Sequence, residues 1–226
     1  MRRLRRSIDI IKQEGIVQFF IKALLELSRG SVCLFSLVKI YTKIVGRDGQ
    51  IWVFSDFYSG QKFSQNKRYL FQYLAKKHPE EVRPIWLTMS PDLYEKLSNE
   101  GYEVYKADSI NAHYYTLRAK YIPIDSGRDF TPWWCTGGAT VIQMSHGIAL
   151  KGSMDSETNW LHRLVSWKTP DYGVFSSEYE ETHHIEYDAE SKGRGWTDHR
   201  LDQNTETIYT GYPKTDAIVN SDIGTI

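Results

Sequence analysis

Residues 140–153, TVIQMSHGIALKGS, combine an apolar run with the residue types that carry acid–base and phosphate chemistry. His146 stands where the predicted strand stops, Gly147 permits a tight turn or a close approach to a ligand, and Lys151 follows. An imidazole with a pKa of about 6.5 can take a proton from a hydroxyl, and an ammonium group can hold a phosphate. A histidine that only caps or packs a strand end would show the same local pattern, so the motif needs support from the surrounding elements.

Three further polar segments follow predicted strands. Each has a purely structural interpretation, because Ser, Gly, Pro and Asp also cap helices and form turns. Four such loops gathered at one edge of a sheet are more typical of a ligand site, since open α/β sheets bind ligands beyond the carboxyl ends of their strands. The polar and turn-forming residues of these segments are Ser55, Asp56, Ser59, Gly60 and Asn66, then Ser176 and Ser177, then Gly211, Pro213 and Asp216.

The elements that would position these residues alternate along the chain. Short apolar runs predict strands at 51–56, 83–88, 102–107, 120–125, 139–145, 171–176 and 207–211. Helices are predicted at 64–78, 90–101 and 109–120, with Ser64, Ser90 and Ser109 as caps and Gly101 as a stop. Parallel strands need crossovers, and these usually contain helices, so the pattern predicts a Rossmann-like, doubly wound α/β domain over residues 46–226. Residues 188–205 are polar and aperiodic and indicate a loop.

The first 45 residues differ in charge from the rest. The whole chain of 226 residues has 28 basic and 28 acidic side chains, so no net field indicates a nucleic-acid partner. Residues 1–45, in contrast, have nine Lys/Arg against three Asp/Glu and apolar residues near helical spacing. This pattern predicts amphipathic helices on an anionic membrane surface, although a helix packed on its own domain would look similar. Charged residues interrupt the apolar span, so a membrane crossing is not expected.

Cysteine and histidine positions do not indicate a metal centre. Cys33 and Cys135 lie far apart and predict reduced cytoplasmic thiols. One group of metal-ligating residue types lacks an established ligand spacing, so we predict no metal site and no cofactor. This group comprises Glu181, His183, His184, Glu186, Asp188 and His199.

With these motifs in place, the sequence resembles the CDP-glycerol glycerophosphotransferases that prime and polymerise teichoic-acid-type polymers. The resemblance covers residues 50–220 and rests on three ordered motifs. A strand, a glycine and an asparagine before an aromatic-rich helix match Phe54, Gly60, Asn66 and Tyr69. The histidine motif matches Gln143, His146, Gly147, Leu150 and Lys151. The later motifs match Ser177, Glu178, Gly211, Tyr212, Pro213, Lys214 and Asp216.

The resemblance implies transfer of glycerol phosphate from CDP-glycerol to a hydroxyl of a lipid-linked or polyol-phosphate acceptor in cell-wall polymer synthesis. His146 would be the general base. Substrate and phosphate binding would fall to Gly147, Lys151, Asn66, Asp125, Ser177, Lys214 and Asp216, with Asn66 and Asp125 as walls of the acceptor cleft. The expected location is peripheral, on the cytoplasmic face of the cell membrane, and homo-oligomerisation stays open.

The sequence also departs from the family pattern. Ser145 replaces a usual Trp, Ala149 a usual Pro, and Lys214 a usual Arg, which removes a bidentate fork for phosphate. The family resembles two-domain GT-B-type transferases, so this chain is expected to be the N-terminal, acceptor-side half, without the C-terminal donor domain. Two alternatives therefore stand, which are another GT-B nucleotide-sugar glycosyltransferase and a non-catalytic acceptor- or membrane-binding half of such an enzyme.

Overall fold

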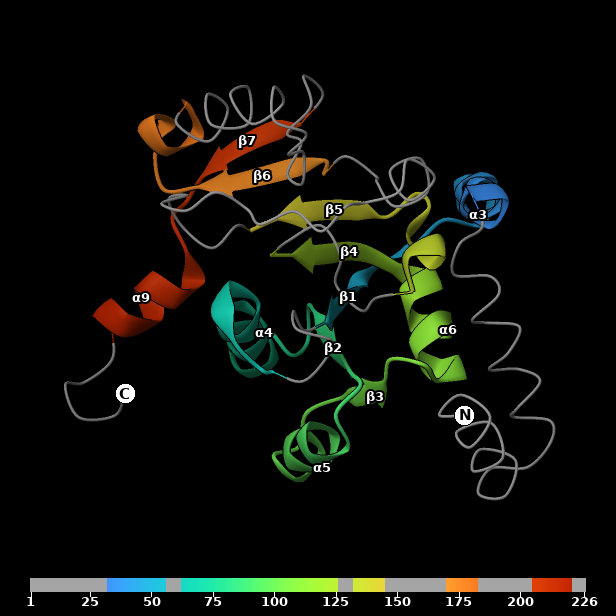
Figure 1. Cartoon of the computed structure of the whole chain (residues 1–226), viewed down its shortest axis with the longest axis horizontal. Helices are drawn as coiled ribbons and strands as arrows, with labels where there is room; N and C mark the ends of the chain where they lie inside the picture. The colour runs from blue at the N-terminus through green and yellow to red at the C-terminus, as the bar shows by residue number, and fades with distance from the viewer. Residues whose placement is uncertain (1–31, 56–61, 126–131, 145–169, 183–204, 221–226) are drawn as a thin grey trace, which may run out of the picture.

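The computed structural model describes residues 32–55, 62–125, 132–144, 170–182 and 205–220. In these ranges, seven parallel strands form one sheet in the order β3-β2-β1-β4-β5-β6-β7 (Figure 1). The strands are β1 (Asp48–Ser55), β2 (Arg83–Thr88), β3 (Val104–Lys106), β4 (Ala119–Ile124), β5 (Thr140–Gln143), β6 (Tyr172–Phe175) and β7 (Glu206–Tyr209). The helices are α3 (Val32–Val45), α4 (Gln65–Lys77), α5 (Pro91–Asn99), α6 (Ile110–Arg118), the 3-10 turn η2 (Trp133–Thr136) and α9 (Pro213–Val219).

The winding of the chain creates a switch point between β1 and β4. From β1 the chain passes through α4 to β2 and through α5 to β3, and α6 then brings it back to β4 on the other side of β1. This order confirms the predicted doubly wound α/β class, and each of the seven predicted strands is present. In such sheets the crevice at the carboxyl ends of the strands flanking the switch point is the usual ligand site.

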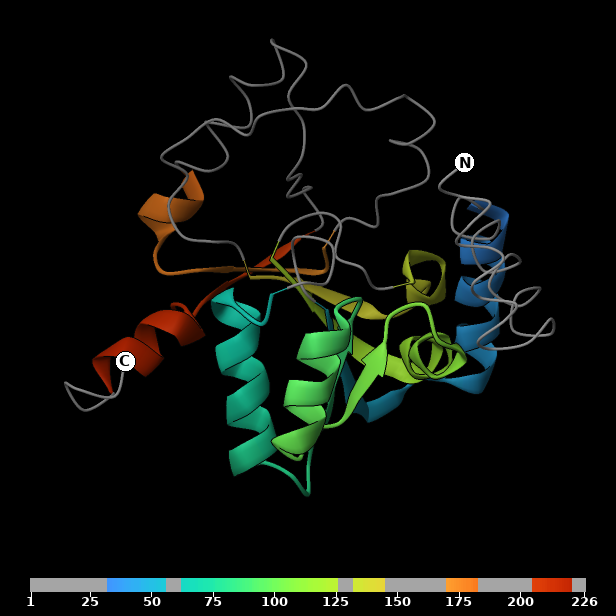
Figure 2. The same cartoon turned by 60° about the horizontal axis from the view of Figure 1, so that its bottom comes forward.

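Alternating side chains on the central strands build a separate core on each face of the sheet. Ile51 and Val53 of β1 point to the face covered by α6, where Ala112 packs against them. Phe54 of the same strand points to the opposite face, where Phe71 of α4 and Leu97 of α5 pack. Successive residues of a strand face opposite sides, so helices on both faces explain the nearly continuous apolar strands. In Figure 2, α4 and α5 lie side by side on their face of the sheet.

Serines precede α4, α5 and α6, and two of the three cap their helix with the side chain. The Ser90 hydroxyl accepts a hydrogen bond from Leu93 N at 3.3 Å, and the Ser109 hydroxyl accepts one from Ala112 N at 3.2 Å. Ser64 occupies the predicted cap position of α4 but makes no capping hydrogen bond with its side chain. The next residue, Gln65, has a φ of 62°, which is unusual and strained for a residue other than glycine.

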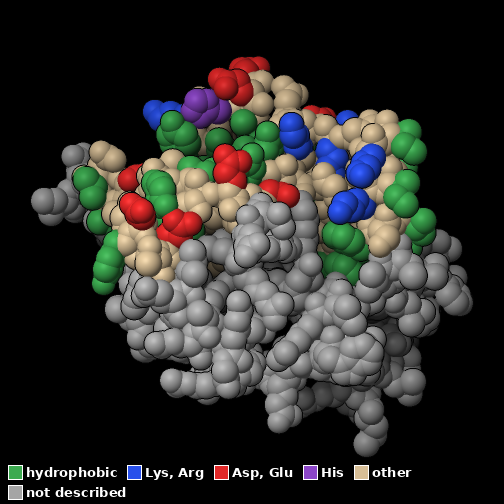
Figure 3. Space-filling model, turned by 90° about the horizontal axis from the view of Figure 1, so that it is seen from above, with side chains coloured by type: hydrophobic (Ala, Val, Ile, Leu, Met, Phe, Trp, Pro, Cys, Tyr) green, Lys and Arg blue, Asp and Glu red, His purple; other side chains and the backbone are tan. Residues whose placement is uncertain are grey.

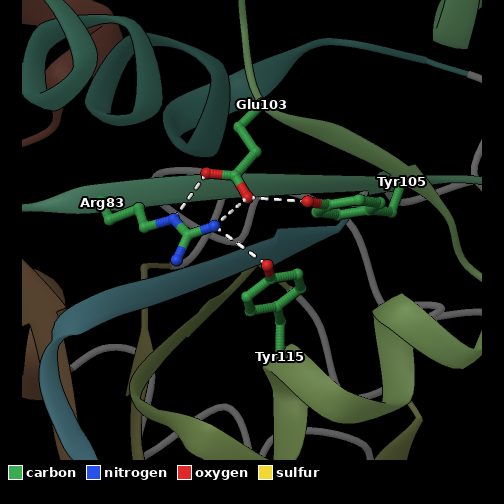
Figure 4. Close-up of polar contacts among 4 residues, drawn as sticks. All are labelled: Arg83, Glu103, Tyr105 and Tyr115. Carbon is green, nitrogen blue, oxygen red and sulfur yellow. Dashed lines mark hydrogen bonds and ion pairs between the residues drawn. The ribbon is translucent and has the colours of Figure 1, made fainter.

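A polar cluster joins β2, β3 and α6 at the amino ends of the strands (Figure 4). Arg83 donates two hydrogen bonds of 2.7 Å to the Glu103 carboxylate and one of 3.0 Å to the Tyr115 hydroxyl. Tyr105 donates to Glu103 at 2.9 Å and its ring stacks on Tyr115. Burial, together with hydrogen bonds with Tyr115 and Glu103, raises the pKa of Tyr105, so its hydroxyl stays a donor at neutral pH. The cluster joins the amino ends of these strands, which lie opposite to the switch-point crevice at the carboxyl ends.

A partly buried arginine holds the segment that enters β1. The Arg47 guanidinium donates to the backbone carbonyls of Thr116 and Ala119, and also to those of Cys135 and Gly137, at 2.6 to 2.8 Å. Burial lowers the pKa of Arg47 to about 10, so the group still carries its proton at neutral pH. Three chain segments, which are that of Arg47 and residues 116–119 and 135–137, are thereby joined at one side chain.

Helix α3 belongs to the same packed unit as the sheet. Phe35 stacks on Trp133 with ring centroids 5.7 Å apart, and the Thr42 hydroxyl donates to Gly137 O at 3.0 Å. The approach is close, because a Cβ atom added at Gly137 would lie 2.5 Å from Phe35 O. The end of the basic segment predicted at 1–45 therefore packs on η2. Residues 1–31 lie outside the described residues.

Candidate active site

Polar and buried charged groups gather at the carboxyl ends of β1, β4, β5 and β6. Ser55 ends β1, Asp125 follows β4, Met144 follows β5 and Ser176 follows β6. In Figure 1 the strands point to one side of the molecule, where α9 lies beside α4. The sequence-predicted site residues of the described ranges belong to this edge, as expected from the parallel sheet.

A buried ion pair lies directly at the switch point. The Lys67 ammonium is 3.7 Å from Asp125 Oδ2 and donates a hydrogen bond to the Ser55 carbonyl. Lys67 is fully buried and Asp125 is 1% exposed. The pair therefore links the start of α4 to the carboxyl ends of both β1 and β4. Gln143 of β5 also contacts this group, because its Nε2 donates a hydrogen bond to the Asp125 backbone carbonyl at 2.9 Å.

Asn66 connects two segments that are far apart in the sequence. Its Nδ2 donates to Met144 O at 3.4 Å, and its Oδ1 accepts from Lys214 N at 3.3 Å. The side chain is 2% exposed. Asn66 belongs to the first motif of the sequence analysis, Met144 follows Gln143 of the histidine motif, and Lys214 belongs to the third motif. The three motifs thus meet at Asn66 through its two hydrogen bonds.

A second buried carboxylate links β6 to the start of α9. Glu180 is 1% exposed and accepts from the backbone N and the hydroxyl of Ser176 at 2.9 and 2.6 Å. Its other oxygen accepts from the Tyr212 hydroxyl at 2.5 Å. Ser177 caps the helical turn at 178–182, because its hydroxyl accepts from Glu180 N at 3.3 Å. The Ser177 side chain is exposed at this edge.

The remaining predicted binding residues lie on α9. Lys214 and Asp216 occupy its first turn, and both side chains are exposed. The contact of Lys214 with Asn66 uses the backbone N–H, so its ammonium group is available on the surface for an anion.

Glu181 directly follows Glu180 and is one of the acidic residues noted in the sequence. Its carboxylate accepts hydrogen bonds from the hydroxyls of Thr207 and Tyr209. The hydrogen bond with Glu181 raises the pKa of Tyr209 to about 12.

Several predicted residues lie outside the described residues. These are His146, Gly147 and Lys151 of the histidine motif, and His183, His184, Glu186, Asp188 and His199 of the ligand-type group. In the described ranges, no three His, Cys, Asp or Glu side chains are grouped so that they could hold a metal ion. None of the described helices is long and apolar enough to cross a membrane.

Sequence reasoning missed the two buried charges of this edge, Lys67 and Glu180. Lys67 is one of several basic residues in an amphipathic helix, and Glu180 belongs to an acidic run, so each would be expected in solvent. The local sequence contains no signal for their burial. Tyr212 and Gln143 belonged to the matched motifs but had no assigned partner.

Fold and site together define a class of protein, a doubly wound α/β protein with a ligand crevice at the carboxyl ends of its strands. A sequence model of the family described as CDP-glycerol:poly(glycerophosphate) glycerophosphotransferase matches residues 38–226. The chain belongs to this family, as its motifs predicted. No curated protein sequence matches it significantly.

Solved structures of the wall teichoic acid polymerase TagF have a similar fold. A histidine-to-asparagine variant soaked with CDPG has a TM-score of 0.55 at 18% identity, over 90% of this chain and 50% of that chain. A histidine-to-alanine variant has a TM-score of 0.53 at 18% identity, over 91% and 50%. A third TagF structure has a TM-score of 0.53 at 20% identity, over 97% and 48%. The chain thus spans about half the length of these proteins.

Proposed function

We propose that this chain takes part in the transfer of glycerol phosphate from CDP-glycerol to a hydroxyl of a polyol-phosphate or lipid-linked acceptor in teichoic acid synthesis. Family membership over residues 38–226 supports the reaction class. The observation that carries the proposal is the meeting of the three family-like motifs at Asn66, on the sheet edge where α/β proteins bind ligands.

The reaction assigns a distinct task to each proposed group. The acceptor hydroxyl oxygen attacks the phosphorus attached to glycerol, the bond from that phosphorus to the CMP oxygen breaks, and His146 takes the hydroxyl proton. Charge on the transferring phosphoryl group needs cationic and N–H donors. Lys151 and the backbone at Gly147 are the proposed donors of the histidine motif, and Lys214 and Ser177 add groups from the described edge.

Turnover by the chain is the direct test. Wild-type protein is incubated with CDP-glycerol and membranes that supply acceptor, and CMP release is measured. We expect release that depends on acceptor, because transfer and departure of CMP are one step. CDP-ribitol and a nucleotide sugar serve as donor controls, and preferred use of a nucleotide sugar would favour another GT-B transferase.

A second candidate function follows from the length comparison. The chain spans about half of the length of the TagF chains to which it is similar, so the activity of those whole proteins is not carried over to these residues. Binding of acceptor or membrane without turnover is the alternative function. Folded chain that releases no CMP but binds acceptor polymer would support this function. It would contradict the expected release of CMP by this chain.

We further propose a peripheral location on the cytoplasmic face of the membrane, with α3 in contact with anionic lipid. Large apolar side chains on α3 are exposed at helical spacing, namely Leu37 (60%), Ile40 (59%), Tyr41 (49%), Ile44 (81%) and Val45 (62%). Figure 3 shows hydrophobic side chains at the right-hand margin, where α3 lies, with Lys and Arg side chains nearby. An apolar stripe beside basic residues is typical of helices that lie in the membrane interface.

The double substitution Leu37→Ser/Ile44→Ser is expected to weaken binding to phosphatidylglycerol vesicles by about tenfold or more, since each buried aliphatic side chain contributes about 1.5–3 kcal/mol. Co-sedimentation with vesicles measures the change. Tyr73→Ser/Ile110→Ser is the matched control, because these side chains are also exposed, at 55% and 48%, but lie on α4 and α6. Equal binding of both variants would contradict a role of α3 in membrane contact.

A further inference from the structure

We propose that Asn66 is a positioning residue, which fixes the carboxyl end of β5 and the first turn of α9 relative to each other through one buried side chain. This inference rests on the proposed function, because the two segments carry groups assigned to the transfer. It gives Asn66 a task inside the protein, in place of the contact with acceptor expected from the sequence.

Both ends of the Asn66 carboxamide are used. Nδ2 donates to Met144 O at 3.4 Å, and Oδ1 accepts from Lys214 N at 3.3 Å. The two partners require opposite polarity, so exchanging O and N would place a donor against an N–H and an acceptor against a carbonyl. A carboxylate at this position only accepts, so it could not donate to Met144 O.

Helix α9 needs this contact because of its own sequence. The cap residue Tyr212 provides no side-chain hydrogen bond to the helix, and Pro213 has no N–H. Lys214 therefore has the first N–H of α9 without an intrahelical acceptor, and Asn66 of α4 supplies that acceptor. The Tyr212 hydroxyl is held separately by Glu180 at 2.5 Å. The start of α9 is thus fixed by side chains from two other elements.

The backbone around Asn66 is itself firmly held. Gln65 on one side has a φ of 62°, and Lys67 on the other is fully buried, with its ammonium bonded to the Ser55 carbonyl. A strained residue persists only where its surroundings over-determine it, and such residues concentrate at functional sites. The strained residue directly precedes Asn66 and Lys67, and both of these side chains are buried at the strand ends.

Misplacement of reacting groups by about 1 Å can lower a rate by about 10²-fold, even when the altered residue does not touch substrate. Met144 is two residues before His146 in the sequence, and Lys214 with Asp216 forms the exposed first turn of α9. Loss of the Asn66 contacts should therefore change turnover more than substrate affinity.

The test uses two variants that separate the contacts. Asn66→Asp retains an acceptor for Lys214 N but places a carboxylate oxygen against Met144 O, and Asn66→Ala removes both contacts. We expect both variants to lower kcat for CMP release by about 10- to 100-fold, with KM for CDP-glycerol and for acceptor within about threefold. Asn99→Asp, the same substitution at an exposed position of α5, should leave both constants unchanged. A raised KM with unchanged kcat would overturn the inference in favour of direct substrate contact.

Amide hydrogen exchange tests the contact between Asn66 and the start of α9 without a measurement of turnover. In Asn66→Ala the Lys214 N–H should lose protection, while in Asn66→Asp it should keep it. Unchanged protection of α9 in Asn66→Ala would overturn the inference. If the wild-type chain releases no CMP, the proposed function fails, and exchange still decides whether Asn66 fixes α9 to β5.

Discussion

Replacement of His146 by Ala is expected to lower the rate of CMP release from CDP-glycerol by about 10²- to 10⁴-fold, which is the usual contribution of a general base. The physical reason is that a neutral hydroxyl is a poor nucleophile toward phosphorus unless its proton leaves in the transition state. Single-turnover measurement of CMP release, at saturating donor and acceptor, isolates this step from product release.

The control for this substitution is His78→Ala. His78 directly follows the last residue of α4, so it lies at the end of that helix remote from Asn66. Its side chain is partly exposed. This variant should retain wild-type turnover. Added imidazole should restore part of the activity of His146→Ala, because a small base can occupy the space left by the side chain. A His146→Ala variant with full activity would remove His146 from the mechanism and leave the reaction class intact.

Replacement of Lys67 by Met is expected to lower the free energy of unfolding by about 3 to 5 kcal/mol, the usual effect of removing one partner from a buried ion pair. The variant leaves the Asp125 carboxylate, 1% exposed, without the cation that lies 3.7 Å away. Met and Lys have similar helix propensities, so α4 itself should be little affected. Urea denaturation followed by circular dichroism measures the change.

Lys76→Met is the matched control, because Lys76 lies on the same helix and is exposed. Its effect should stay within about 0.5 kcal/mol. The double variant Lys67→Met/Asp125→Asn should lose less than the sum of the two single losses, since the uncompensated charge is then absent. Additive losses would show that Lys67 and Asp125 act independently and would contradict the ion-pair explanation.

The fold could be predicted from the sequence because it depends on local patterns. The apolar runs that became β1 to β7 and the serines before α5 and α6 carry their own hydrogen-bonding and hydrophobic preferences. The alternation of strand and helix then restricts the topology to a doubly wound sheet. β3 is shorter than its predicted range of 102–107, because the Tyr102 N–H donates to Leu97 O of α5 at 3.0 Å instead of pairing with β2.

The sequence by itself determined the α/β class, the positions of the strand-end loops and the family to which the motifs belong. Only the tertiary structure decided which polar residues of those loops face inward. Lys67 and Lys76 have the same chemistry and lie on one helix, yet Lys67 is buried against the ends of β1 and β4 and Lys76 is in solvent. Asn66 likewise meets Met144 and Lys214 only after the sheet has brought three distant segments to one edge. Burial and partner choice are properties of contacts between distant segments, so no local pattern could have specified them.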